Sequence, residues 1–272
     1  ADAVLCQLLP RVQQELEEAH GKIPGAELAL IAMGKLGGHE ITCASDLDLI
    51  LLYDFPEDVM QSDGKRPLAP SQYYSRLTQR LVSALTAPTA EGVLYEVDFR
   101  LGPSGNSGPL ATRFAAFKDY QANNAWTWEH MALTRARVIT SSSPDFSAQI
   151  DSAVSQLLQE KRDLEKLAFD VSDMRARIQK DKPAKSPWQV KGVPGGLIDI
   201  EFIAQFLQLA HGADCPQILQ TRTEDVLLKA REAGLLSEED ADTLIPTLRT
   251  YDDLRQILKL TLTGRFDPAT AP

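Results

Sequence analysis

Ser45-Asp46-Leu47-Asp48 begins an apolar strand predicted over residues 46–53, and it follows the glycine-bearing run Gly34-Lys35-Leu36-Gly37-Gly38. A first apolar strand, residues 28–33, precedes the glycines, so the local order is strand, glycine turn, polar segment and strand. Because successive side chains of a strand point to opposite faces, Asp46 and Asp48 project together while Leu47 faces the core. The pattern predicts a small sheet that carries two carboxylates beside a glycine turn.

These two carboxylates indicate a metal-dependent nucleotide site. Two neighbouring carboxylates repel each other unless a cation lies between them. Their oxygens are hard ligands that suit Mg²⁺, which usually takes one or two carboxylates and completes its shell with substrate phosphates. A glycine turn lets backbone N–H groups approach phosphate oxygens closely. We therefore interpret Asp46 and Asp48 as metal ligands, and Gly34, Gly37 and Gly38 as a phosphate-binding turn.

An Asp-x-Asp pair alone is a weak signal, because two acids often meet by chance at an exposed strand end. Here both acids begin a strongly apolar strand, where unpaired carboxylates would be costly. Together with the glycines upstream, this arrangement resembles that of the polymerase-β-like nucleotidyltransferases. The resemblance implies a polymerase-β-like domain of the α+β class with a small mixed sheet.

Asp98 is the candidate for a third carboxylate. It lies in a strand predicted over residues 93–101, in which Glu96, Asp98 and Arg100 share one face. If this strand lies beside the strand of Asp46, Asp98 completes an acidic cluster that can hold two metals for an in-line phosphoryl displacement. Arg100 would then balance phosphate charge. The alternative is a surface ion pair between Arg100 and a neighbouring acid.

Three further polar groups are candidates for binding the nucleotide. Lys35 and Ser45 flank the metal acids and are placed to touch the leaving phosphates. Lys191 opens a basic, glycine-rich segment, residues 191–196, that leads into a predicted helix, whose first N–H groups can bind phosphate. The alternative for this segment is a flexible interdomain connection with a solvated lysine. Trp126 and Trp128 are expected to pack rather than to stack on a base.

The patterns divide the chain into a nucleotidyltransferase domain, residues 1–143, and an all-α helical bundle domain, residues 144–272. Apolar spacing predicts helices in the first domain over residues 3–20, 71–85 and 115–137. No strand signal follows residue 143. Helices are predicted there over residues 146–180 (as one helix or two), over 198–209, from 237, and over 246–262.

Composition limits the classes of function. The chain has 272 residues, 43% hydrophobic and 24% charged, as in soluble globular proteins. Its net charge of −10 argues against a broad electrostatic grip on nucleic acid, so we expect no nucleic-acid partner. No apolar run reaches transmembrane length and no signal peptide is visible, so we expect a cytoplasmic protein without membrane contact. The three dispersed cysteines indicate neither zinc nor disulfides, and the absence of an initial Met suggests a piece of a longer protein.

Five motifs together resemble the glutamine synthetase adenylyltransferase family. They are Gly34-Lys-Leu-Gly-Gly38, Ser45-Asp-Leu-Asp48, Leu94-Tyr-Glu-Val-Asp98-Phe-Arg100-Leu, Ala125-Trp-Thr-Trp-Glu-His130 and Gly195-Gly-Leu-Ile-Asp-Ile-Glu201-Phe. The resemblance runs over residues 28–262. It implies a bifunctional enzyme with two homologous halves, of which one attaches AMP to a tyrosine of glutamine synthetase and the other removes it by phosphorolysis.

The segment at residues 126–130 and the pair Asp199 and Glu201 look more like the adenylylating, C-terminal half. The resemblance implies ATP as substrate, Mg²⁺ or Mn²⁺ held by the three aspartates, glutamine synthetase as protein substrate and regulation by a PII signalling protein. Two alternatives remain, the adenylyl-removing half and a catalytically silent module that binds nucleotide or PII. The chain departs from the family at Gly102, where the family usually has arginine.

Overall fold

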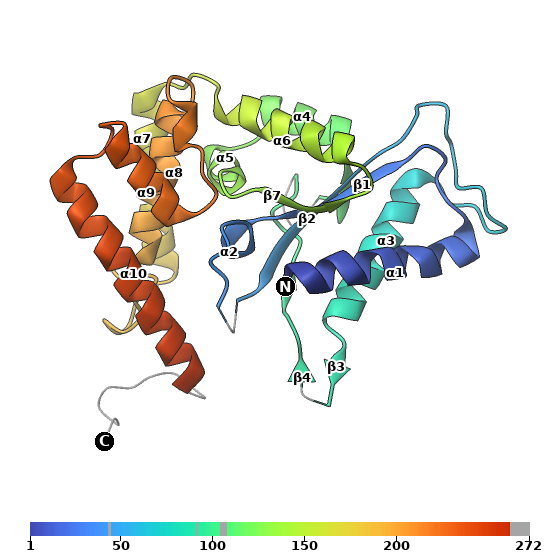
Figure 1. The fold of residues 1–272 in the computed structure, drawn as a ribbon, viewed down its shortest axis with the longest axis horizontal. Helices are drawn as coiled ribbons and strands as arrows, with labels where there is room; N and C mark the ends of the chain where they lie inside the picture. The colour runs from blue at the N-terminus through green and yellow to red at the C-terminus, as the bar shows by residue number, and fades with distance from the viewer. Residues whose placement is uncertain (43–44, 91, 104–107, 262–272) are drawn as a thin grey trace. The chain divides into compact units, whose positions relative to one another are not determined.

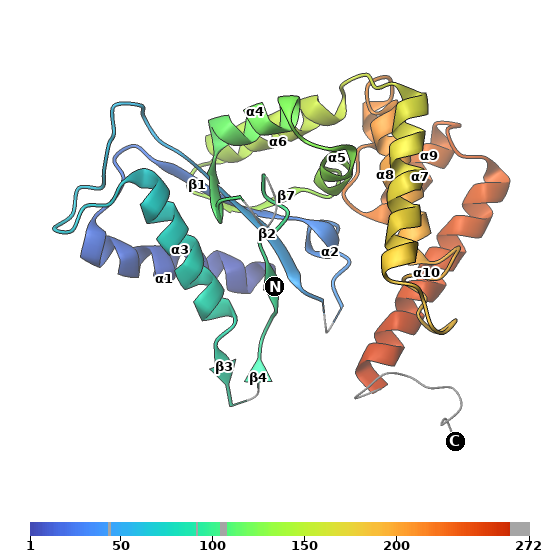
Figure 2. The ribbon, with the colours of Figure 1, turned by 180° about the vertical axis from the view of Figure 1, so that it is seen from behind.

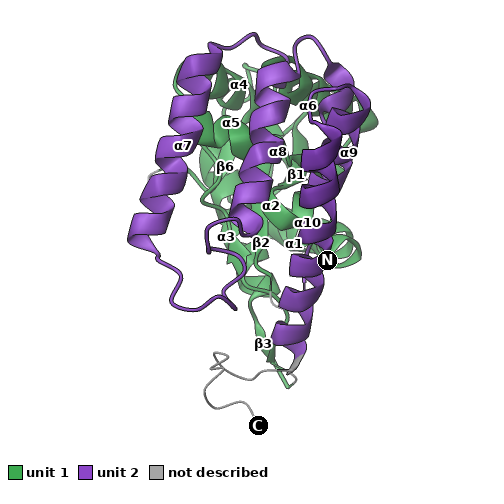
Figure 3. Ribbon diagram, turned by 90° about the vertical axis from the view of Figure 1, so that its left-hand side faces the viewer, with its two compact units in different colours: residues 1–40, 45–157 green, residues 41–44, 158–272 purple. Residues whose placement is uncertain are grey.

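The fold is seen in a computed structural model that describes residues 1–42, 45–90, 92–103 and 108–261 (Figure 1). It divides into two compact units, shown in different colours in Figure 3. Unit 1 comprises residues 1–40 and 45–157, and unit 2 comprises residues 41–44 and 158–272.

The units divide at residue 157, whereas the sequence patterns placed the boundary after residue 143. The intervening residues belong to helix α6 (Pro144–Leu158). Its Phe146 ring packs edge-on against Phe114 of unit 1, with ring centroids 5.5 Å apart. This aromatic contact is one reason why α6 groups with unit 1.

Unit 1 is built on a five-stranded mixed sheet. Its strands are β1 (Glu27–Ala32), β2 (Leu47–Asp54), β5 (Val97–Asp98), β6 (Ala111–Arg113) and β7 (Arg137–Ser141). β1 pairs antiparallel with both β2 and β7, while β5 and β6 each pair parallel with β2. The predicted α+β class with a small mixed sheet is therefore confirmed.

The central strands β1 and β2 explain the two apolar runs of the sequence. Residues 28–32 of β1 and 49–53 of β2 are all buried, because helices cover both faces of the sheet. The polar residues of β2 lie at its ends, where Asp48 and Asp54 are partly exposed. The sheet thus presents Asp48 at one edge of a continuous core.

Helices lie on both sides of this sheet, as Figures 1 and 2 show. α1 (Asp2–His20) and α3 (Pro70–Leu85) lie on one side, and α4 (Phe114–Asn123) and α6 lie on the other. The prediction for residues 71–85 is confirmed, because Tyr74, Leu77, Leu81 and Leu85 form the buried face of α3.

Two predictions in unit 1 are wrong. The helix expected over residues 115–137 is divided into α4, α5 (Thr127–Leu133) and the strand β7. The β-branched run Val138-Ile139-Thr140 favours this strand, which fills the free edge of β1. The strand expected over residues 93–101 is interrupted: β3 (Pro88–Thr89) and β4 (Gly92–Val93) form a separate hairpin, and only β5 joins the sheet.

Unit 2 is all-helical in its described residues, as predicted. Its elements are α7 (Leu164–Asp181), α8 (Leu197–His211), the 3₁₀ turn η2 (Pro216–Ile218), α9 (Thr223–Glu232) and α10 (Glu238–Thr261). Apolar residues of α8, η2, α9 and α10 form its core. Two helices were expected where α10 is continuous through Pro246, because buried Ile245 and Leu248 anchor it on both sides of the proline.

Two further observations concern the cysteines and the length of the helices. Cys6 and Cys215 are free thiols, and Cys43 lies outside the described residues. Within the described ranges, no helix is both long enough and apolar enough to span a membrane.

Candidate active site

Strand pairing brings two of the predicted carboxylates together. β2 and β5 run parallel, with Leu47 opposite Val97 and Asp48 opposite Asp98. The register is fixed at its start by the Leu47 N–H, which donates to Glu96 O at 2.8 Å. Asp46 lies two residues before Asp48, so all three acids lie at one end of two adjacent strands.

The glycine turn lies directly against Asp48. After β1, the Met33 N–H donates to Asp48 O at 2.9 Å, and the chain enters the short helix α2 (Gly34–Gly37). Gly34 has φ +51°, and a Cβ there would lie 2.2 Å from Asp48 Oδ2. Only glycine permits both this conformation and this close approach. The carboxylate of Asp48 is therefore held against the backbone of the turn.

The other two glycines shape the turn. The Gly37 N–H donates to Met33 O at 2.9 Å, and the Gly38 N–H donates to Gly34 O at 3.2 Å. A Cβ on Gly37 would lie 1.8 Å from Arg135 O, so a larger residue does not fit. In this structure both N–H groups serve the turn itself, so those of Gly37 and Gly38 are not presented to a phosphate.

Two arginines, one on β7 and one just before it, support the glycine turn. The sequence patterns did not single them out. Arg137 donates to Leu36 O at 3.0 Å and Gly37 O at 3.2 Å, and its Nη1 binds Asp2 Oδ2 at 2.9 Å. Buried Arg135 forms an ion pair with Glu40, which follows the turn. Their partners lie about a hundred residues away in sequence. The alternation of arginines in Arg135-Ala136-Arg137 was the only local signal.

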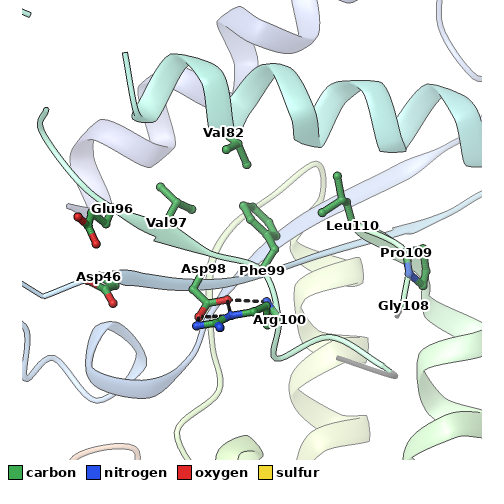
Figure 4. Close-up of a pocket in the computed structure, with 10 residues that line it drawn as sticks. All are labelled: Asp46, Val82, Glu96, Val97, Asp98, Phe99, Arg100, Gly108, Pro109 and Leu110. Atoms are coloured by element: carbon green, nitrogen blue, oxygen red, sulfur yellow. Dashed lines mark hydrogen bonds and ion pairs between the residues drawn. The ribbon is translucent and has the colours of Figure 1, made fainter. Parts of the chain in front are cut away.

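Asp98 is engaged by Arg100, as Figure 4 shows. The Arg100 Nε donates to Oδ1 and Oδ2 at 2.9 and 2.8 Å, its Nη2 also donates to Oδ2, and its backbone N–H donates to Oδ1 at 2.8 Å. These bonds hold the pKa of the Asp98 carboxyl below its usual range. β5 ends at Asp98, before Arg100, and the two side chains form the ion pair that the sequence left as an alternative.

A pocket of about 400 Å³ adjoins these residues. Figure 4 shows its two kinds of wall: Val97 and Phe99 point toward Val82 of α3, while Asp98 and Arg100 lie on the other side of the strand. Asp46, Glu96 and Leu110 also line it. The pocket therefore combines an apolar wall with an acidic rim.

The carboxylates suit a hard divalent cation, although the described residues contain no three His, Cys, Asp or Glu side chains close enough to hold one together. Asp46 lies just before β2 and Asp48 near its start, and Mg²⁺ needs only one or two carboxylates when phosphates complete its shell. The absent Cβ of Gly34 leaves room for the Asp48 carboxylate beside the turn. Asp98 fits the same ion only when it leaves Arg100.

In unit 2, exposed Lys191 opens a glycine segment that is fixed by hydrogen bonds. The Asp199 carboxylate accepts hydrogen bonds from the Arg175 guanidinium through both of its oxygens. It also accepts one from the Gly195 N–H at 2.7 Å. Arg175 also donates to Gly192 O and Val193 O at 3.3 Å. Asp199 thus ties the segment to α7 and α8.

The start of α8 differs from the expected phosphate site. The N–H groups of Leu197 and Ile198 donate to Val190 O and Lys191 O. Those of Asp199 and Ile200 donate to Gly196 O. A helix normally leaves four N–H groups unpaired at its start, here those of Gly196, Leu197, Ile198 and Asp199. The Gly196 N–H also has a partner, Val193 O at 2.9 Å, so this helix start does not present these groups to a phosphate.

The segment at residues 126–130 caps a helix and exposes its tryptophans. Buried Glu129 accepts the Trp126 N–H at 2.9 Å and the Tyr120 hydroxyl at 2.9 Å. Buried His130 lies 2.9 Å from Gln121 O through Nε2. Trp126 and Trp128 were expected to pack rather than to stack on a base, and their side chains are 71% and 39% exposed. A Cβ on Gly102 would have its nearest neighbour at 3.8 Å, so packing does not require glycine there.

Comparison with known proteins follows the division of the fold. Residues 1–153 match the family described as glutamate-ammonia ligase adenylyltransferase. Residues 170–267 match a second family, the GlnD PII-uridylyltransferases. The first match covers the acids, the glycine turn and the supporting arginines, and the second covers most of the helical unit.

Curated relatives match over the whole chain. The bifunctional glutamine synthetase adenylyltransferase/adenylyl-removing enzyme of Rhizobium meliloti is 49% identical over 275 residues, which is 100% of this chain and 28% of the relative. That of Xanthobacter autotrophicus is 49% identical over 272 residues, again 100% of this chain and 27% of the relative. The chain thus spans little more than a quarter of these relatives. It belongs to the glutamate-ammonia ligase adenylyltransferase family of nucleotidyltransferases.

Proposed function

We propose that this chain is a polymerase-β-like adenylyltransferase that moves AMP from ATP to a tyrosine hydroxyl of glutamine synthetase and releases pyrophosphate. The observation that carries the proposal is the parallel register of β2 and β5. It sets Asp98 opposite Asp48, with Asp46 two residues earlier in the chain, just before β2 begins. Separate segments of the chain therefore supply acidic ligands to one place, beside a turn built to lie against them.

In this proposal Asp46 and Asp48 hold Mg²⁺ or Mn²⁺, and Asp98 joins them. A divalent ion so held supplies charge neutralisation to the phosphates and to the attacking oxygen. Lys35, Ser45 and Gly34 steady the departing phosphates from the turn. The chain's own part in catalysis is then mostly to position the reactants and to neutralise their charge.

We assign the chain to the adenylylating half of the bifunctional enzyme. The support is the resemblance at residues 126–130 and at Asp199 and Glu201. In the structure Glu129 caps α5 and Asp199 fastens the glycine segment, so both motifs have structural roles here. The alternative is the removing half, which would form ADP from phosphate and adenylylated glutamine synthetase.

Unit 2 supports a regulatory partner. Its match to the PII-uridylyltransferases links this helical unit to enzymes named for acting on PII proteins. We propose that a PII signalling protein regulates the transfer, with unit 2 as the region to test first. Titration of unit 2 variants and wild type with PII by calorimetry would measure this contact. Unchanged heats throughout would remove unit 2 from the proposal.

The central experiment follows label from α-³²P-ATP to unmodified glutamine synthetase with Mg²⁺. We expect transfer by the wild type and a loss of about 10²-fold or more in Asp46→Asn/Asp48→Asn and in Asp98→Asn. The matched control is Asp54→Asn, at the opposite end of β2, where the carboxylate binds Arg113 at 2.9 Å. This control should keep its transfer rate.

The other functions give different results in the same preparation. Formation of ADP from adenylylated glutamine synthetase and phosphate, without label transfer, would identify the removing half instead. ATP binding that ignores Mg²⁺ and survives the Asp46→Asn/Asp48→Asn change would identify the silent module. Near-normal transfer by Asp98→Asn would exclude Asp98 from the reaction.

A further inference from the structure

The Asp98 carboxylate is fully occupied by one side chain. Both of its oxygens accept hydrogen bonds from the Arg100 guanidinium, and Oδ1 also accepts the Arg100 backbone N–H. The Asp98 side chain is mostly buried, with 16% exposed, whereas 68% of the Arg100 side chain is exposed. Arg100 therefore covers the carboxylate from the solvent side, and it can swing away without disturbing the core.

The guanidinium also interacts electrostatically with all three predicted acids. Its pKa is raised, first by the hydrogen bond and charge of Asp98 and then by the charges of Asp48 and Asp46. Among the described residues that line the pocket, Arg100 is the one base beside three acids. A positive group thus already lies within the field of the carboxylates proposed as metal ligands.

A divalent cation and the Arg100 guanidinium would both bind the carboxylate oxygens of Asp98. Each needs carboxylate oxygens, and two positive groups a few ångströms apart repel each other. Among the described residues no three such side chains are grouped to hold a metal, and Asp98 is turned to Arg100. The ion pair and the complete acidic cluster are therefore alternative states of one site.

We propose that Arg100 is an internal counter-cation that competes with the divalent ion for Asp98, and that it moves to a nucleotide phosphate when Asp98 joins the metal site. The inference rests on the proposed function, because it takes Asp98 as a metal ligand. Arginine suits both roles, since its planar fork binds carboxylate and phosphate bidentately. The exchange would make full metal binding depend on nucleotide.

The test measures Mn²⁺ binding to the full chain by electron paramagnetic resonance of free Mn²⁺, first alone and then with α,β-methylene-ATP. We expect Arg100→Met to tighten Mn²⁺ binding without nucleotide by about two- to fivefold, the range for exposed ion pairs. With the nucleotide analogue, the same variant should bind Mn²⁺ and analogue about tenfold more weakly, because the phosphate contact is lost. This reversal is not expected from a merely structural arginine.

Two variants separate the exchange from simple charge. Arg100→Lys keeps the positive charge but loses the planar bidentate guanidinium. If the competition depends on occupation of the Asp98 carboxylate, its Mn²⁺ affinity without nucleotide should match that of Arg100→Met. If the Mn²⁺ affinity of Arg100→Lys instead matches that of the wild type, charge repulsion alone explains the effect of Arg100→Met and the proposal is overturned. Arg113→Met is the matched control, because it breaks an arginine–aspartate pair at Asp54, the other end of β2. It should leave Mn²⁺ binding unchanged.

Asp98→Asn separates this inference from the proposed function. If Asp98→Asn leaves Mn²⁺ affinity unchanged with the analogue, Asp98 is no ligand, and the proposed metal site fails with the inference. If Asp98→Asn weakens binding while no Arg100 variant changes it in either condition, the metal site stands and the competition is overturned.

Discussion

Gly34 and Asp48 touch across the loop that joins β1 and β2: a Cβ on Gly34 would lie 2.2 Å from Asp48 Oδ2. The same glycine has φ +51°, a conformation that side chains rarely adopt. The position of the Asp48 carboxylate therefore depends on the absence of a single methyl group. This contact links the fold to the proposed chemistry, because it aligns a metal ligand with the turn that would face the phosphates.

Gly34→Ala should abolish most activity while leaving the fold intact. We expect the methyl group to displace the Asp48 carboxylate and the backbone strain to destabilise the protein by about 1–2 kcal/mol. Adenylyl transfer, Mn²⁺ binding and urea unfolding would measure the three effects. Transfer at the wild-type rate would show that the position of Asp48 is not critical.

Gly234→Ala is the matched control for this change. Gly234 has φ +69°, but no atom lies within 4 Å of the position that its Cβ would take. It should therefore show the strain alone, with a similar loss of stability and no loss of Mn²⁺ binding.

Arg137→Ala should loosen the glycine turn. Arg137 donates to Leu36 O and Gly37 O and pairs with Asp2, so its removal leaves two carbonyls at the end of α2 without these donors. We expect about 1–3 kcal/mol of lost stability and a raised KM for ATP with a smaller change in kcat. Asp2→Asn is the control, because it removes the half-exposed ion pair and keeps both carbonyl bonds. Equal effects of the two variants would mean that the ion pair, and not the turn, is what Arg137 supports.

The sequence predicted the parts of this site that depend on local patterns. The apolar run was recognised as a strand with Asp48 near its start, and Arg100 was predicted to lie beside Asp98, to which it is hydrogen-bonded. The apolar spacing also predicted α3 correctly, because one face of this helix is buried along its length. Such patterns persist in the fold because a few neighbouring residues determine them.

Other parts depend on contacts that no local pattern records. β7 pairs with β1 across more than a hundred residues, so the short β-branched run at 138–140 did not by itself reveal a strand of this sheet. The roles of Arg135 and Arg137 depend on that pairing and were missed with it. Whether Asp98 faces a metal or Arg100 is a balance between two cations, and alternation alone does not decide it.

The aromatic core between β2 and α3 predicts a loss of stability in alkali. Tyr53 and Tyr74 stack with centroids 4.1 Å apart, Tyr73 meets Tyr74 edge-on, and all three are buried. Burial raises the pKa of each of these tyrosines above its ordinary value of 10. The unfolded chain therefore loses these protons at lower pH than the folded chain. The stability they contribute is complete below pH 10 and falls as the pH rises above it.

Urea unfolding between pH 8 and 11 would measure this loss, with Tyr74→Phe as the comparison. Phenylalanine preserves the ring and cannot ionise, so the variant should lose less stability per pH unit above pH 10 than the wild type. Parallel pH profiles would show that Tyr74 ionises alike in the folded and unfolded chain. Lysines and cysteines titrate equally in both proteins, so they cancel in the difference.

Asp199 should act as a latch for the glycine segment of unit 2. Its carboxylate binds Arg175, of which 13% is exposed, and the Gly195 N–H at 2.7 Å. Asp199→Asn removes the charge opposite a mostly buried arginine, so we expect about 2 kcal/mol of lost stability and faster proteolysis after Lys191. Asp170→Asn, in an exposed pair with Lys166 on α7, is the control and should cost at most about 0.5 kcal/mol.

A double-mutant cycle distinguishes the latch from a binding role. Replacing both partners with apolar residues, Arg175→Met/Asp199→Leu, removes the buried charge as well as its partner. The double variant should therefore be more stable than the sum of the single changes predicts. Its nucleotide affinity should stay close to that of the wild type if Asp199 only fastens the segment. Loss of nucleotide binding in Asp199→Asn with unchanged stability and proteolysis would instead make Asp199 part of the binding site.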